Sequence, residues 1–151
     1  MGLLNDLGEG PVALDTSIFI YFIEEHPKYL PLVDPVFGAV AAGELDIVTS
    51  SLTLLETLVV PFRFGNAVLI DRYEVLLTNS RGVRLIGLDD DFLRAAAHVR
   101  AATRARTPDA IQAAAALAGG CRVLLANDKR FPRLPGLRVL HLDDYLPPPD
   151  S

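Results

Sequence analysis

The chain has 151 residues, of which 50% are hydrophobic and 22% are charged, and its formal net charge at pH 7 is −5. This length predicts one domain with a substantial core, and no stretch reaches the roughly 18 uncharged apolar residues that a membrane span requires. The single cysteine, Cys121, excludes an internal disulfide, so together with the lack of a signal-peptide pattern it favours a reducing, cytoplasmic location.

The N-terminal half alternates short apolar strands with helices. We expect residues 1–10 to be a poorly structured lead-in to a domain that covers residues 11–146. A strand over Pro11–Asp15 ends in an acid, and Thr16 or Ser17 can cap a helix that runs from Ile18 to about Glu25. The remaining elements of this half are predicted as a helix, a strand and two helices, at residues 29–42, 46–49, 51–60 (where Pro61 interrupts) and 67–78.

The C-terminal half contains the most informative unit, a helix, turn and strand over residues 107–126. Thr107 can cap the helix, Pro108 suits its first position, and Gly119 with Gly120 can end it. Residues 122–126 are an apolar run typical of a parallel strand that is covered on both faces. The other elements are a strand, a helix and a last strand at residues 83–88, 89–105 and 137–142, followed by a tail at 147–151. Strands that alternate with helices predict an α/β fold, a three-layer α/β/α sandwich around a parallel sheet.

Charge is distributed unevenly along the chain. Residues 1–91 hold 14 acidic and 5 basic side chains, whereas residues 94–133 hold eight basic side chains and only two acids, Asp109 and Asp128. A basic segment whose only acids are candidate metal ligands is suited to hold a phosphodiester beside bound cations. The alternative is that the arginines at 94–106 form a solvated helix face, and the sequence leaves both readings open.

Four carboxylates stand where a ligand pocket is expected. Asp15 and Asp128 follow strands, at the edge where open parallel sheets bind ligands. Asp109 lies in the first turn of a helix, and Glu56 lies within a helix of mostly apolar residues. Each acid also has a structural alternative. Asp15 could cap a helix, Asp128 could belong to a turn, Asp109 could complement the helix dipole, and Glu56 could belong to a polar helix face. If the four converge, their repulsion calls for a hard cation such as Mg²⁺ or Mn²⁺, which can activate water to attack a phosphodiester.

Two other acidic segments give weaker signals. Asp89, Asp90 and Asp91 open a helix, which predicts capping and complementation of the helix dipole more than a metal contact. The segment Asp15–Ser17 superficially resembles the start of an aspartyl-phosphate phosphatase. That chemistry usually needs a second acid where Ser17 stands, so a small-molecule phosphatase is the weaker alternative.

Four segments, in order, resemble the successive motifs of the PIN domain family, and most closely its VapC-type ribonuclease toxins of prokaryotic toxin–antitoxin pairs. They are VALDTSIFIY at 12–21, SLTLLE at 51–56, PDAI at 108–111 and ANDKRF at 126–131. The resemblance implies a five-stranded parallel sheet and metal-dependent cleavage of single-stranded RNA to 5′-phosphate and 3′-hydroxyl ends. By position it implies that Asp15, Glu56, Asp109 and Asp128 are the catalytic, metal-binding acids. One departure is Ala126, where the family often has a hydroxyl residue that supports the last acid.

Charge and resemblance together predict the partners. Arg104, Arg106, Lys129 and Arg130 are our candidates for contacts with the RNA backbone. The family resemblance also implies a small antitoxin. Because the segment Ile18–Ile23 is apolar all the way round and Phe62 and Phe64 lie at a predicted helix break, we expect a homodimer that binds this antitoxin through an apolar groove. The alternatives are that the helix at 29–42 covers this surface, or that the protein is a catalytically weak module that binds RNA or protein.

Overall fold

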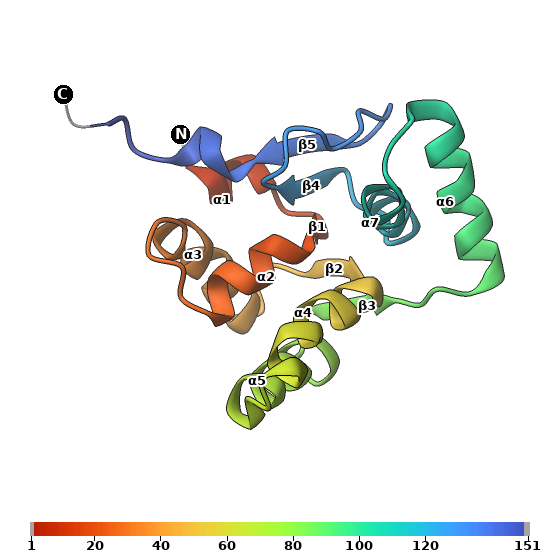
Figure 1. Cartoon of the computed structure of the whole chain (residues 1–151). Coiled ribbons are helices and arrows are strands. Elements are labelled where there is room, and N and C mark those ends of the chain that lie inside the picture. The colour runs from red at the N-terminus through yellow and green to blue at the C-terminus, as the bar shows by residue number, and fades with distance from the viewer. Residues whose placement is uncertain (1, 150–151) are drawn as a thin grey trace.

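The computed structural model describes residues 2–149, which form a five-stranded, all-parallel sheet with helices on both faces (Figure 1). The strand order is β3-β2-β1-β4-β5. The strands are β1 (Val12–Leu14), β2 (Ile47–Ser50), β3 (Val83–Ile86), β4 (Val123–Ala126) and β5 (Arg138–His141). The expected α/β sandwich on a five-stranded parallel sheet is confirmed.

The helices lie in two layers, with a helical hairpin at one end. They are α1 (Leu3–Leu7), α2 (Thr16–Ile23), α3 (Leu30–Ala41), α4 (Leu52–Arg63), α5 (Ala67–Thr78), α6 (Asp90–Thr103), α7 (Thr107–Ala118) and the 3-10 helix η1 (Leu142–Tyr145). Figure 1 shows α2 and α3 on one side of the sheet, α6 and α7 on the other, and the α4–α5 hairpin at the lower end. None of the helices within residues 2–149 is long and apolar enough to cross a membrane.

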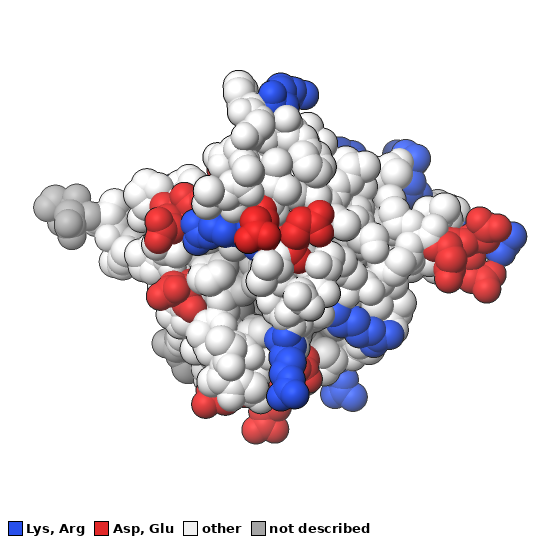
Figure 2. Space-filling view, turned by 90° about the horizontal axis from the view of Figure 1, so that it is seen from below, with Lys and Arg blue, Asp and Glu red and all other residues white. Residues whose placement is uncertain are grey.

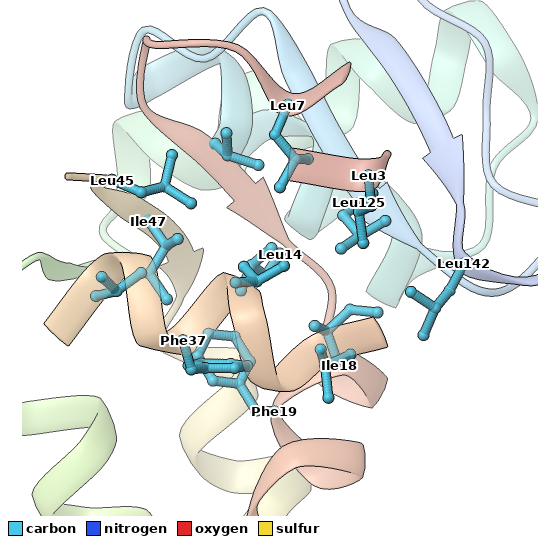
Figure 3. Close-up of a cluster of buried hydrophobic side chains, with 14 of the residues drawn as sticks. Leu3, Leu7, Leu14, Ile18, Phe19, Phe37, Leu45, Ile47, Leu125 and Leu142 are labelled. Carbon is cyan, nitrogen blue, oxygen red and sulfur yellow. The ribbon is translucent and has the colours of Figure 1, made fainter. Parts of the chain in front are cut away.

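Three local predictions are wrong. Residues 3–7 form α1 instead of an irregular lead-in, and Leu3 and Leu7 are buried in the same cluster as Leu14 (Figure 3). Helix α4 continues past Pro61, which lies so near the C-terminal end that the last turn still closes through the amide of Phe64. The predicted hydroxyl caps are also wrong: α2 begins at Thr16 with Asp15 at its N-cap position, and α7 begins at Thr107 with Arg106 at its N-cap position. The end of the predicted tail, residues 150–151, lies outside the described residues.

The larger core lies between the sheet and helices α1 to α3. Every residue of β1 and β2 is buried, as expected for central strands of a parallel sheet. Phe37 of α3 packs against Phe19 and Phe22 of α2, with ring centroids 5.7 and 4.1 Å apart. Tyr21 likewise stacks on Tyr29 at 4.4 Å. Helix 29–42 therefore covers the apolar segment 18–23, and the prediction that this segment lies bare is wrong.

Helix α7 approaches the sheet closely because its buried face is built from alanines. Ala113, Ala114, Ala115 and Ala116 are all buried. At the end of the helix, a Cβ on Gly119 would lie 2.7 Å from a methyl carbon of Val48 in β2, so only glycine fits there without a shift. This close packing brings the one polar side chain of the alanine run, Gln112, within hydrogen-bond distance of β2.

Candidate active site

The four candidate carboxylates line one pocket, with a volume of about 600 Å³, at the carboxyl ends of β1 and β4. Asp15 directly follows β1, and its amide donates to the carbonyl of Leu125 in β4 at 3.0 Å. Asp128 follows β4, while Glu56 and Asp109 reach the pocket from α4 and α7. From β1 the chain continues to β2 on one side, whereas β4 lies on the other, so the pocket lies where a doubly wound sheet opens a crevice.

Asp15 is not the ordinary helix cap that its position suggests. Its side chain makes no capping hydrogen bond with α2. Burial raises the pKa of its carboxyl to about 6, and the negative charges of Asp109, Glu56 and Asp128 act in the same direction, although the Thr16 amide partly offsets them. A carboxylate held in this environment favours a proton or another cation as its neighbour.

Glu56 is held by a hydroxyl, not by a cation. Thr16 Oγ1 donates to Glu56 Oε1 at 2.7 Å. The same hydroxyl lies 2.9 Å from Thr53 Oγ1 on α4. The polar environment that a carboxylate requires within a mostly apolar helix is therefore supplied by side chains from two helices.

Gln112 sets the direction of this hydrogen bond. Its Oε1 accepts from the amide of Ser50 at 3.3 Å, and this contact fixes the side-chain amide so that Nε2 faces α2 and α4. Nε2 donates to Thr16 Oγ1 at 3.2 Å and to Thr53 Oγ1 at 2.9 Å. Because Thr16 accepts from Gln112, its single hydrogen is available for Glu56. The buried network thus presents Glu56 as a hydrogen-bond acceptor.

Asp109 and Asp128 are paired with arginines instead. Arg106 donates from Nε and Nη2 to Asp109 Oδ2 at 2.9 and 2.7 Å, and its Nη2 also lies 2.6 Å from Asp128 Oδ2. Arg130 contacts both oxygens of Asp128 at 3.1 Å, and its amide donates to Oδ1 at 2.9 Å. Hydrogen bonds from Arg130, with help from Arg106, hold the pKa of Asp128 well below its usual range.

The four basic candidates therefore divide into two pairs. Arg106 and Arg130 contact carboxylates of the pocket. Lys129 is exposed and lines the pocket, and Arg104 is exposed at the end of α6. The helix-opening segment Asp89–Asp91 caps α6, since the Asp89 side chain accepts from the amide of Phe92 at 2.8 Å.

The donor set of the pocket suits a hard divalent cation, because all four acids offer oxygen and the pKa of Asp15 is raised where negative charges gather. Even so, within residues 2–149 no three Asp, Glu, His or Cys side chains lie close enough together to hold one ion. Arg106 lies between Asp109 and Asp128 and contacts both. The residues fit Mg²⁺ or Mn²⁺ in kind, while two of them face a guanidinium.

Sequence reasoning missed the buried polar network that supports Glu56. Its members, besides Thr16 and Gln112, are Thr53 and Thr49, whose hydroxyls lie 2.8 Å apart. One signal was available: Gln112 is the only polar residue between Ala110 and Ala118. Ala126 is fully buried and offers no hydroxyl, so the hydroxyl groups of this region come from α2, β2 and α4 instead.

Comparison with known proteins agrees with this fold. The PIN domain family model matches residues 12–137. Among solved structures, VapBC2 from Rickettsia felis, bound to a promoter DNA fragment, is similar with a TM-score of 0.65 and 20% identity, over 87% of this chain and 98% of that one. A toxin–antitoxin complex from Klebsiella pneumoniae gives 0.64 and 20%, over 87% and 97% of the two chains. Mycobacterium tuberculosis VapC20, a sarcin–ricin loop cleaving toxin, gives 0.63 and 17%, over 80% and 92%. Comparison with curated protein sequences gives no match.

Proposed function

The chain belongs to the PIN domain family, and from this premise we propose that it is a metal-dependent endoribonuclease of single-stranded RNA, the toxin of a type II toxin–antitoxin pair. The observation that carries the proposal is the meeting of four carboxylates, from four separate elements, in one pocket at the carboxyl ends of β1 and β4. The likeness to a sarcin–ricin loop cleaving toxin supports RNA as the substrate class.

Asp15, Glu56, Asp109 and Asp128 would hold one or two Mg²⁺ or Mn²⁺ ions. When bound, such a cation supplies an acidic water and stabilises negative charge on phosphate oxygens. The chain's own contribution is orientation: Thr16 and Gln112 keep one oxygen of Glu56 in a fixed direction. The basic side chains at the rim, among them Lys129, provide charge for a phosphodiester backbone.

The direct test is cleavage of a single-stranded RNA pool by the purified protein. We expect cleavage in Mg²⁺ or Mn²⁺, none in EDTA, and products with 5′-phosphate and 3′-hydroxyl ends. The same sequences annealed into duplexes should be cut more slowly, since a stiff duplex cannot bend its backbone into a narrow pocket. Cleavage that persists in EDTA, or that prefers the duplex, would contradict the proposal.

We further propose that the antitoxin covers the α4–α5 hairpin. Large apolar side chains are exposed along this hairpin, including Leu55, Phe62, Phe64 and Val68. Figure 2, which views the molecule from the side of this hairpin, shows wide uncharged areas between groups of charged side chains. Such a surface on a water-facing hairpin suits the apolar face of an amphipathic helix. Several similar structures are toxin–antitoxin complexes, which supports an antitoxin as the occupant.

The partner proposal is tested by co-expression with the product of any small reading frame directly upstream. We expect a stable complex that Phe62→Ser and Phe64→Ser together disrupt, while Leu93→Ser, an exposed leucine on α6, leaves it intact. Light scattering of the chain alone tests the predicted homodimer. Complex formation that ignores both phenylalanines would exclude the α4–α5 surface.

One observation favours the alternative of a catalytically weak PIN module that binds RNA. Two of the four acids, Asp109 and Asp128, are already neutralised by arginines of the same chain. RNA binding without cleavage in every divalent metal tested would select this alternative over the nuclease.

A further inference from the structure

Arg106 occupies an unusual place for a basic residue in a candidate metal site. It lies at the N-cap position of α7, three residues before Asp109, and its side chain is 48% exposed. Its guanidinium nevertheless contacts Asp109, whose side chain is 8% exposed, and reaches Asp128 beyond the end of β4. Among the described residues it is the only cation that touches two of the four carboxylates.

The contacts of Arg106 fall on carboxylate oxygens of two acids that would hold a metal. Its Nη2 lies 2.7 Å from Oδ2 of Asp109 and 2.6 Å from Oδ2 of Asp128. A divalent cation coordinates a carboxylate oxygen at about 2.0–2.2 Å, so an ion on either Oδ2 would lie within about 5 Å of the guanidinium. Two such positive charges repel in a partly buried pocket, and the two cations therefore bind in competition.

We infer that Arg106 is an internal counter-cation that exchanges with the divalent metal at Asp109 and Asp128 and is then available to bind an RNA phosphate. The inference rests on the proposed function and names a further residue of the same site. A guanidinium suits both positions, because its forked donors match the geometry of carboxylate and phosphate alike. Since Arg106 lines the pocket and is half exposed, a released side chain stays beside the carboxylates where the phosphodiester would lie.

Arg130 is not equivalent to Arg106. It contacts Asp128 alone, where its own backbone amide also donates to the carboxylate. Its pairing is thus tied to the local turn after β4, whereas the Arg106 contacts join the start of α7 to that turn, 22 residues along the chain. Displacement of Arg106 frees Oδ2 of Asp109 from its cation and leaves Oδ2 of Asp128 in contact with Arg130 alone, so two acids change at once.

The first experiment measures Mn²⁺ binding by calorimetry or electron paramagnetic resonance, without RNA. The variants are Arg106→Gln and the matched control Arg104→Gln, an exposed arginine two residues away that makes no ion pair among the described residues. Both remove one positive charge. An internal competitor lowers the apparent affinity for Mn²⁺ in proportion to the fraction of molecules in which the competitor has left the site. We expect Arg106→Gln to bind Mn²⁺ about tenfold more tightly than wild type, and Arg104→Gln to bind within about twofold of wild type.

Thermal melting supplies a second readout that needs no cleavage. In EDTA, Arg106→Gln should melt below wild type, because Asp109 loses the partner that neutralises it, and saturating Mn²⁺ should remove the difference. Arg106→Lys keeps the charge but cannot bridge both acids as a guanidinium does, so its Mn²⁺ affinity should fall between those of wild type and Arg106→Gln. Equal tightening by Arg104→Gln and Arg106→Gln would show only a long-range charge effect and would overturn the exchange.

A third measurement tests whether Arg106 contacts RNA once a metal has displaced it from Asp109 and Asp128. With Ca²⁺ in place of Mg²⁺ to slow cleavage, Arg106→Gln should weaken binding of a single-stranded RNA oligonucleotide more than Arg104→Gln does. In EDTA, Arg106→Gln should weaken it no more than the control. If Arg106→Gln leaves Mn²⁺ affinity unchanged while wild type cleaves RNA, the exchange is wrong and the nuclease proposal stands. If wild type cleaves no RNA in any metal, the nuclease proposal itself fails.

Discussion

The candidate active site has two halves that hold their acids by different means. In the first, which we call the hydroxyl half, Asp15 and Glu56 are accompanied by Thr16 and Gln112. No cationic side chain of the described residues forms an ion pair with either acid. Burial and the neighbouring acids raise the pKa of Asp15 to about 6, and within residues 2–149 no ion pair neutralises the acids of this half.

The second, the arginine half, consists of Asp109 and Asp128 with Arg106 and Arg130. Here the chain supplies its own cations, and the pKa of Asp128 is held well below its usual range by hydrogen bonds from Arg130 and Arg106. Two carboxylates of one pocket are therefore perturbed in opposite directions. The comparison teaches that acids of one pocket can differ in whether the folded chain supplies a cation for them, so the two halves should respond differently when an acid is removed.

The largest effect should come from removing one acid from each half. Asp15→Asn and Asp109→Asn should each lower RNA cleavage more than about 100-fold, since even residues that only support metal ligands cost 10- to 100-fold. In EDTA their stabilities should diverge. Asp15→Asn relieves repulsion and removes no capping hydrogen bond, so it should unfold no more easily than wild type. Asp109→Asn removes the carboxylate that pairs with Arg106 at the start of α7 and should unfold more easily than wild type.

Denaturant unfolding in EDTA, together with a cleavage assay in Mg²⁺, measures both effects. Asp91→Asn is a suitable control, because this acid is exposed in the first turn of α6, away from the pocket. If Asp15→Asn and Asp109→Asn shift the free energy of unfolding equally, the two halves do not differ as described.

The next effect concerns the support of Glu56. Gln112→Met removes the amide that orients Thr16 while keeping most of the volume, and it should weaken Mn²⁺ binding about tenfold. In a Glu56→Gln background the same change should have no further effect on Mn²⁺ affinity, because the negative charge that holds the cation at this position is already gone. The loss of stability, by contrast, should be similar in both backgrounds, since the amide of Ser50 loses its acceptor in each.

A matched control for this cycle is Thr57→Val. Thr57 is buried on the same helix as Glu56, and its hydroxyl bonds only to the carbonyl of Leu54 within that helix. It should leave Mn²⁺ affinity unchanged. An additive effect of Gln112→Met and Glu56→Gln on Mn²⁺ affinity would show that Gln112 acts on the fold alone.

The convergence of the acids was predictable because it follows from topology. The carboxyl ends of parallel strands meet at one edge, so acids after β1 and β4 share a pocket whatever the details of packing. The resemblance to the PIN domain motifs implied that Glu56 and Asp109, each on a predicted helix, join them. The fold was predictable for the same reason, since apolar strands alternating with helices admit few arrangements.

The contacts between elements were not predictable. Gln112 reaches Thr16 only because α7 packs closely enough for Gly119 to touch Val48, a distance that no local pattern encodes. The pairing of Arg106 depends on the turn after α6, where Arg104 adopts a left-handed conformation. The exposed apolar surface was predicted on the segment 18–23 and at Phe62 and Phe64. Helix α3 and the sheet cover the first, whereas both phenylalanines are exposed on the α4–α5 hairpin.

The two halves should also respond oppositely to pH. Between pH 3.8 and about 6, folded Asp15 binds more protons than unfolded Asp15, so its contribution to the free energy of unfolding falls as the pH rises through this window. In EDTA, we expect the free energy of unfolding of wild type to fall by on the order of 2 kcal/mol relative to that of Asp15→Asn over this pH window. Asp128 has a lowered pKa, so its contribution is present above the ordinary range of an aspartate and is lost on acidification.

Unfolding by urea at several pH values between 4 and 7 measures this difference. Saturating Mn²⁺ should reverse the trend, because a bound cation replaces the proton on Asp15. A stability difference between wild type and Asp15→Asn that does not change between pH 4 and 6.5 would rule out a carboxyl with a raised pKa at this position.

The smallest effect should come from substitution of Arg130, which tests whether the two arginines of the arginine half have the same role. The Arg130 side chain is 72% exposed, and without it Asp128 keeps its contact with Arg106 at 2.6 Å. The backbone amide at position 130 also continues to donate to Oδ1. Arg130→Gln should therefore lower the free energy of unfolding in EDTA by less than about 1 kcal/mol, the usual range of an exposed ion pair, and should change Mn²⁺ affinity less than Arg106→Gln does.

Added salt should shrink the effect of Arg130→Gln on stability more than that of Arg106→Gln, because Arg106 pairs with a buried acid. Equal losses from the two substitutions at every salt concentration would mean that bridging two acids gives Arg106 no special role.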